Sequence, residues 1–134
     1  MRYIVGVFLI SLCCMQALYA DSAKKTDFTD QQKPIVVKRS NTVFTIVLSS
    51  NPTTGYSWFL KNYDADLIKP LSRKYYPPQT KLIGAGGYEK WVFAVKEKGF
   101  IVPQTTNITL IYTRPWELQG AQVTNFKVVT TNDY

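Results

Sequence analysis

Histidine is absent from this 134-residue chain, and cysteine occurs only twice, at Cys13 and Cys14. Without histidine there can be no Ser-His or Cys-His catalytic pair and no histidine-based metal site. Carboxylates are scarce as well: nine occur, and the closest internal pair, Asp64 and Asp66, lies in a turn-like stretch where such residues usually form the turn and face water. We therefore expect a protein that is not an enzyme and that uses no metal and no cofactor.

The start of the chain has the composition of a secretory signal peptide. Arg2 is its single charge, an apolar run follows over 3–14, and the small residue Ala20 precedes a polar stretch. A retained membrane anchor is the competing interpretation, but the apolar run is short for a membrane span. A lipid-modified Cys13 is disfavoured because the residue before it is bulky. We expect residues 1–20 to be removed and the protein to be exported, periplasmic or secreted, with no membrane attachment.

Removal of the signal peptide would leave 114 residues, enough for one domain, and would take away both cysteines. The remaining 15 Lys and Arg against nine Asp and Glu give a net charge of +6, which favours an acidic partner or surface. We do not expect nucleic acid as a partner, because the protein is exported and its basic residues form no stripe. The densest group of basic residues comprises Lys69, Arg73, Lys74 and Lys81, and a solvated edge strand explains it. We expect a monomer by default.

From Pro34 onward the pattern is that of β-strands, whereas residues 21–33 are polar and are expected to form a flexible N-terminal arm. Pro70 lies inside one of the strands and indicates an edge or a bulge there. Short strands separated by turns indicate an all-β sandwich over residues 34–134. The strands are expected at 35–37, 42–49, 56–60, 67–76, 88–95, 105–112 and 122–130, with Phe44, Trp58, Trp91, Phe93 and Phe126 in the core.

Three turn-rich segments separate these strands, and we name them loop 1 (51–56), loop 2 (84–87) and loop 3 (114–116). The interval between successive loops has room for two strands and a turn. Two antiparallel crossings return a chain to the end from which it started, so all three loops should lie at one end of the sandwich. The residues concerned are Asn51, Pro52, Thr53, Thr54, Gly55 and Tyr56 in loop 1, Gly84, Ala85, Gly86 and Gly87 in loop 2, and Arg114, Pro115 and Trp116 in loop 3.

The composition of each loop is suited to binding, but each also has an interpretation that involves no binding. Loop 1 is stiff, because Pro52 fixes its own φ and two β-branched residues follow, but it could be a simple hairpin connection. Loop 2 has three glycines, which permit close backbone approach or merely a flexible turn; a phosphate-binding loop would need a helix after it, where a β pattern follows. In loop 3, Trp116 and its neighbouring arginine are typical of binding hot spots, unless the indole folds back onto the sandwich.

Taken together, the motifs resemble a known family. Asn51 to Trp58 (NPTTGYSW), then Gly84 to Gly87 (GAGG), then Tyr112 to Trp116 (YTRPW) look like the three signature loops of the chagasin-type inhibitors of cysteine peptidases, in the same order and spacing. The resemblance covers roughly residues 35–131. It implies an immunoglobulin-like antiparallel β-sandwich without an inter-sheet disulfide, which agrees with the loss of both cysteines.

The resemblance also implies a function and a role for each loop. It implies reversible, non-covalent inhibition of papain-like cysteine peptidases, with the cleft occluded by all three loops. Loop 1 would enter the cleft, where Thr53 and Thr54 would cover the catalytic cysteine. Loop 2 would lie along the substrate-binding side through backbone contacts, and loop 3 would pack on the primed side. The alternative hypothesis is an exported immunoglobulin-like module that binds glycans or adheres to a surface protein.

Overall fold

The computed structural model describes residues 27–132, so the expected signal peptide and the first part of the expected arm lie outside the described residues. Within this range the chain forms eight strands and two short 3-10 helices, with no α-helix and no helix that is long and apolar enough to cross a membrane. The elements are β1 (Asp27–Phe28), β2 (Ile35–Lys38), β3 (Val43–Ser50), η1 (Pro52–Thr54), β4 (Ser57–Asn62), β5 (Ile68–Tyr76), β6 (Gly87–Val95), η2 (Glu97–Phe100), β7 (Gln104–Arg114) and β8 (Glu117–Thr131).

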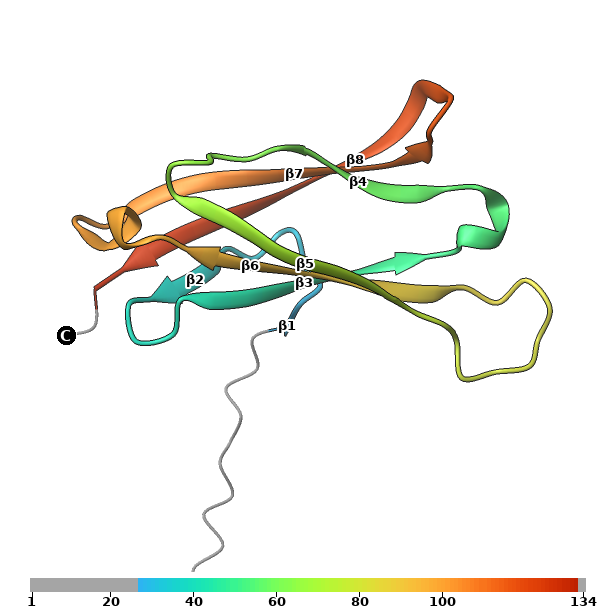
Figure 1. The fold of residues 1–134 in the computed structure, drawn as a ribbon, viewed down its shortest axis with the longest axis horizontal. Coiled ribbons are helices and arrows are strands. Elements are labelled where there is room, and N and C mark those ends of the chain that lie inside the picture. Colours follow the sequence, from blue (N-terminus) through green and yellow to red (C-terminus); the bar gives the residue numbers. More distant parts are fainter. Residues whose placement is uncertain (1–26, 133–134) are drawn as a thin grey trace, which may run out of the picture.

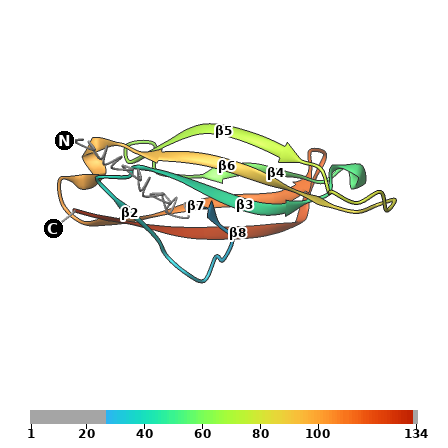
Figure 2. The same ribbon diagram turned by 90° about the horizontal axis from the view of Figure 1, so that it is seen from below.

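The strands form two four-stranded sheets, ordered β1-β3-β6-β5 and β2-β8-β7-β4. Figure 2 shows the sheets as two stacked layers, as expected for an all-β immunoglobulin-like sandwich. The four long ladders, β3–β6, β5–β6, β4–β7 and β7–β8, are antiparallel. The exceptions are the short edge strands β1 and β2, which pair in parallel with β3 and β8. No cysteine occurs among the described residues, so no disulfide joins the two sheets there.

The core lies between the two sheets and follows the alternation of the strands. Phe44 and Phe93, on neighbouring strands of one sheet, stack with ring centroids 5.7 Å apart. Trp58 and Trp91 are only 4% and 9% exposed, which confirms that they belong to the core rather than to a binding surface. Phe126 is buried as predicted, and so are the apolar residues that alternate along the same strands, namely Ile46, Leu48, Val95, Ile108 and Leu110. Burial of these side chains is the main favourable contribution to the stability of a domain that has no disulfide in this range.

Two edge strands, β5 and β1, differ in how far the sequence pattern predicts them. β5 lies at the edge of its sheet and shifts its register between Pro70 and Ser72, which confirms the prediction made from the proline. The flexible arm, in contrast, was expected to extend as far as residue 33, and this is wrong for Asp27 and Phe28. They form β1, because Phe28 packs against the core and the Asp27 carboxylate pairs with the Lys90 ammonium at 2.7 Å.

The number of strands between the loops places all three loops at one end of the molecule. β4 and β5 separate loop 1 from loop 2, and β6 and β7 separate loop 2 from loop 3. Figure 1 shows η1, the segment before β6 and the turn between β7 and β8 at the same end, while η2 lies at the opposite end near the C-terminus. The predicted convergence is therefore confirmed.

Candidate functional site

Loop 1 is a compact turn rather than an extended segment. Pro52–Thr54 form the single 3-10 turn η1, closed by hydrogen bonds from the Thr54 amide to the Asn51 carbonyl (3.2 Å) and from the Gly55 amide to the Pro52 carbonyl (3.0 Å). Gly55 ends the turn with a φ of 81°, a left-handed conformation that glycine adopts without steric cost. Residues 52–54 are exposed at the tip. The loop thus presents a stiff, solvent-facing corner.

Asn51 connects loop 1 to loop 2 and to the strand that leads into loop 3. Its backbone amide donates to the Tyr112 hydroxyl at 2.9 Å, on the strand that leads into loop 3. Its side-chain amide donates to the Gly84 carbonyl of loop 2 at 3.0 Å, and its side-chain oxygen accepts a hydrogen bond from the Thr53 hydroxyl at 2.6 Å. One residue therefore ties loop 1 to loop 2 and to the base of loop 3.

Loop 3 packs against loop 1 and leaves its tryptophan in solvent. Arg114 donates to the Thr54 carbonyl at 3.2 Å, and its guanidinium lies over the ring of Tyr56 at 4.7 Å. The Trp116 ring lies so close to Gly55 that a Cβ on that glycine would be 3.5 Å from it. Trp116 is nevertheless 75% exposed, so the indole does not fold back into the sandwich. An exposed tryptophan with a supported position is available to a partner.

Loop 2 is shaped by its glycines and preceded by two apolar side chains. Gly84 has a φ of 80°, and a Cβ on Gly86 would be 3.3 Å from the Ser50 carbonyl oxygen, so loop 2 lies close to the start of loop 1. Leu82 and Ile83 are among the most exposed apolar residues of the described chain, at 75% and 105%. The sequence interpretation missed these two residues. They could have been noticed in the sequence, because two adjacent apolar residues there lie outside any segment with the alternating pattern of a strand.

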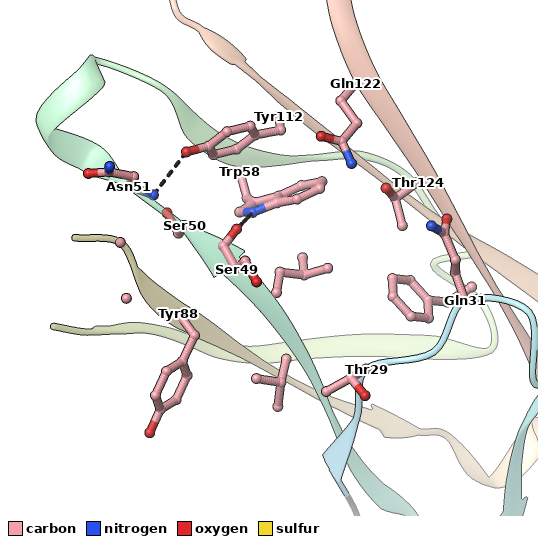
Figure 3. A pocket seen from close by; sticks show the side chains of 15 residues that line it. Thr29, Gln31, Ser49, Ser50, Asn51, Trp58, Tyr88, Tyr112, Gln122 and Thr124 are labelled. Carbon is pink, nitrogen blue, oxygen red and sulfur yellow. Dashed lines mark hydrogen bonds between the residues drawn. The ribbon is translucent and has the colours of Figure 1, made fainter. Parts of the chain in front are cut away.

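A cluster of aromatic rings and a cavity lie beneath the loops. Tyr112 packs between Tyr56 and Trp58, with ring centroids 5.4 and 4.9 Å away. A cavity of about 650 Å³ opens beside them, lined by residues from β3, β8 and the segment before β2 (Figure 3). Ser49 to Asn51 line this cavity and so have fewer packing contacts on that side. The position of the base of loop 1 therefore depends on hydrogen bonds as well as on packing.

An ion pair with a buried carboxylate lies next to the loops. The Glu89 side chain is fully buried, and its carboxylate accepts hydrogen bonds from Arg73 (2.7 and 3.0 Å), Ser50 (2.8 Å) and Trp91 (3.1 Å). Burial raises the pKa of Glu89, but the hydrogen bonds from these three residues and the charge of Arg73 lower it further, so the net shift is downward. The same contact raises the pKa of Arg73. The carboxylate is therefore ionised at neutral pH.

This pair refines one sequence interpretation. As predicted, Arg73 lies on an edge strand and stays partly solvated, with its side chain 43% exposed, but its guanidinium also lies over the Trp91 ring at 5.4 Å. The reason is the buried carboxylate of Glu89, which draws the guanidinium inward. Glu89 could have been noticed from the sequence, since it has the same parity along the strand as the buried residues Trp91 and Phe93.

The described residues hold no cluster of three or more His, Cys, Asp or Glu side chains that could bind a metal ion. What the site offers is a surface, not a reactive group: a stiff corner, a glycine-rich edge with two apolar side chains, and an exposed indole. All thirteen residues selected from the sequence lie in these three adjoining loops. Their individual roles in binding stay predictions.

Comparison with known proteins identifies the family. The profile described as Chagasin family peptidase inhibitor I42 matches residues 38–129, which is more than half of the chain. The chain belongs to this family. Within the chagasin family, a segment of 75 residues is 40% identical to chagasin from Trypanosoma cruzi. That segment covers 53% of this chain and 64% of chagasin, so it spans less than two thirds of the relative.

Two solved structures share the fold. A crystal structure of a cysteine protease inhibitor from Entamoeba histolytica superposes with a TM-score of 0.59 and 23% identity, covering 78% of this chain and 93% of that one. The solution structure of amebosin gives a TM-score of 0.56 at 21% identity, covering 80% and 96%. At this level of identity the similarity establishes the common β-sandwich, whereas membership of the chagasin family rests on the sequence match.

Proposed function

We propose that this protein is a reversible, non-covalent inhibitor of papain-like cysteine peptidases and that it fills the active-site cleft with loops 1, 2 and 3. The family match supports the class of activity. The observation that carries the proposal is the arrangement of the loops: Asn51 joins loop 1 to loop 2 and Arg114 joins loop 3 to loop 1, so that the three present one continuous surface. A family of peptidase inhibitors also agrees with the expectation that the chain is not an enzyme.

The geometry of loop 1 explains how it could occupy a peptidase cleft without being cleaved. A peptidase holds its substrate as an extended strand, with the scissile carbonyl at attack distance from the thiolate. In loop 1 the carbonyls of Asn51 and Pro52 are instead turned into the 3-10 turn, where they accept amide hydrogen bonds. Thr53 and Thr54 at the tip would then cover the catalytic cysteine while no peptide bond adopts the geometry for attack.

Loops 2 and 3 would supply the flanking contacts. Leu82 and Ile83 project from the segment before Gly84 and would enter apolar subsites on the substrate side, while Trp116 would pack on the primed side. A complex of this kind is expected to bury roughly 1,600 Å² in total, the standard size for peptidase–inhibitor pairs. Rigid loops bind tightly because they lose little conformational entropy on association.

We also propose where the inhibitor acts and in which oligomeric state. The composition of residues 1–20 supports export, and the inhibitor would then act outside the cytoplasm, in the periplasm or after secretion, as a monomer. No feature of the described residues favours the glycan-binding or adhesion alternative over the inhibitor.

The proposal predicts that a protein comprising residues 21–134 inhibits papain with an inhibition constant of 1 μM or lower, a threshold that corresponds to about −8 kcal/mol of binding free energy. Inhibition should be reversed by dilution, and mass spectrometry should find the inhibitor intact after long incubation. Papain whose catalytic cysteine carries a bulky covalent blocking group should bind much more weakly. Absence of inhibition for papain and for related peptidases, or equal binding to the blocked enzyme, would rule the proposal out.

Replacing Asn51 with alanine should weaken papain inhibition by roughly tenfold, because two hydrogen bonds that position loops 1 and 2 are lost and each contributes about 0.5–1.5 kcal/mol. Asn125→Ala is the matched control. Asn125 also accepts a single side-chain hydrogen bond, from Thr109, but it lies on β8 away from the loops. Titration of papain with both variants compares them, and equal inhibition constants would contradict a positioning role for Asn51.

A further inference from the structure

We propose that Arg73 and Glu89 are positioning residues that brace loop 1 from below and thereby set the affinity of the inhibitor. The inference rests on the proposed function, because the loop that they brace is the one expected to enter the peptidase cleft. Neither residue lies in a loop. Arg73 is on β5 and Glu89 is on β6, two residues after the end of loop 2.

The bridge runs from one side of loop 1 to the other. Ser50, immediately before the loop, donates its hydroxyl hydrogen to Glu89 at 2.8 Å. Glu89 accepts two hydrogen bonds from the Arg73 guanidinium, at 2.7 and 3.0 Å. The same guanidinium donates to the hydroxyl of Ser57, immediately after the loop, at 2.6 Å. The two ends of loop 1 are thus tied together through side chains of two other strands.

The sheet topology explains why loop 1 needs such a tie. β3 and β4, which flank the loop, belong to different sheets, so no backbone ladder joins them to each other. β5 and β6, which carry Arg73 and Glu89, are paired in a long antiparallel ladder, which runs without a shift from Ser72 to Tyr76. The ladder is a rigid platform, and the ion pair extends that platform to both ends of a loop that crosses between sheets beside a cavity.

The energetics of this ion pair favour a role in geometry over a role in stability. Taking the Glu89 carboxylate out of water costs much of what its attraction to the partly exposed Arg73 guanidinium returns, so the pair contributes little net stability. Its directional hydrogen bonds nevertheless specify one arrangement. Glu89 is fully buried and Arg73 approaches it with two nitrogens, a two-point geometry that a single-point cation cannot reproduce. A loop fixed before binding loses less entropy when the complex forms.

Two variants separate positioning from stability. The double variant Arg73→Met with Glu89→Gln removes both charges together, keeps an oxygen that can accept the Ser50 hydrogen bond, and should unfold at nearly the wild-type urea concentration. Arg73→Lys keeps the ion pair but cannot contact Glu89 twice and Ser57 at once. Both variants should show faster hydrogen exchange at the amides of Thr54 and Gly55, by at least tenfold, with unchanged exchange at core amides such as that of Ile46.

The same variants should inhibit papain at least tenfold more weakly, with most of the change in the dissociation rate. The exchange measurement needs no peptidase, so it decides on the brace even if wild-type protein fails to inhibit papain and the proposed function falls. Wild-type exchange rates at Thr54 and Gly55 in both variants would overturn the proposal that Arg73 and Glu89 brace loop 1. Faster exchange there together with wild-type inhibition constants would overturn its role in affinity.

Discussion

Replacing Trp116 with alanine should weaken inhibition of papain by about 30-fold or more, corresponding to at least ~2 kcal/mol of binding free energy. The side chain is 75% exposed, yet its ring rests near Gly55 and its neighbour Arg114 is held by Thr54. A large apolar surface that is already in position gains the full benefit of burial in a cleft. Titration of papain with the variant provides the measurement.

The control for this experiment is Ile101→Ala. Ile101 is 73% exposed, almost the same as Trp116, but it adjoins η2 at the opposite end of the sandwich. Neither side chain is part of the core, so both variants should unfold at the wild-type urea concentration. A loss of inhibition that is similar for Ile101→Ala and Trp116→Ala would show that the loop end of the molecule has no special part in binding.

Replacing Gly87 with alanine should destabilise the fold by about 3 kcal/mol, at the upper end of the usual cost of overpacking. A Cβ on Gly87 would overlap the carbonyl oxygen of Tyr76 and lie 2.8 Å from the Tyr75 hydroxyl. Tyr76 belongs to the strand that pairs with β6, so the ladder must open at the base of loop 2 to make room. Urea unfolding followed by tryptophan fluorescence would measure the change.

Gly120→Ala serves as the comparison for Gly87→Ala. Gly120 has a φ of 78°, and an added Cβ would meet no atom within 4 Å. Alanine there strains only the backbone, at a cost of about 1–2 kcal/mol. We expect Gly87→Ala to be the more destabilising of the two; the reverse order would mean that the close approach of β5 to Gly87 does not limit this position.

The convergence of the loops at one end could be predicted because it depends only on the number of strands between them. Two strands lie in each interval between loops, and alternating apolar residues reveal those strands in the sequence. Core residues such as Phe93 and Trp58 follow from the same alternation and from the size of their side chains. The exposure of Trp116 was left open, since a tryptophan beside a proline can either face solvent or fold back.

Other features depend on contacts between residues that are distant in sequence. The hydrogen bond from Asn51 to the Gly84 carbonyl and the pairing of Arg73 with Glu89 follow from the strand register, which no local pattern specifies. The parity of Glu89 places it among buried residues, but its partner becomes known only when β5 is aligned with β6. β1 is only two residues long, too short to show alternation, and Phe28 was the single hint of it.

The most direct test of a single peptidase-binding surface is a nuclear magnetic resonance titration of labelled residues 21–134 with papain, followed at every backbone amide. We expect the signals of loops 1, 2 and 3, together with those of Leu82 and Ile83, to change in parallel as papain is added. Amides near Ile101 and Val36 should stay unchanged. Changes centred on that opposite end of the sandwich, or confined to one loop, would contradict the claim that three loops form a single peptidase-binding surface.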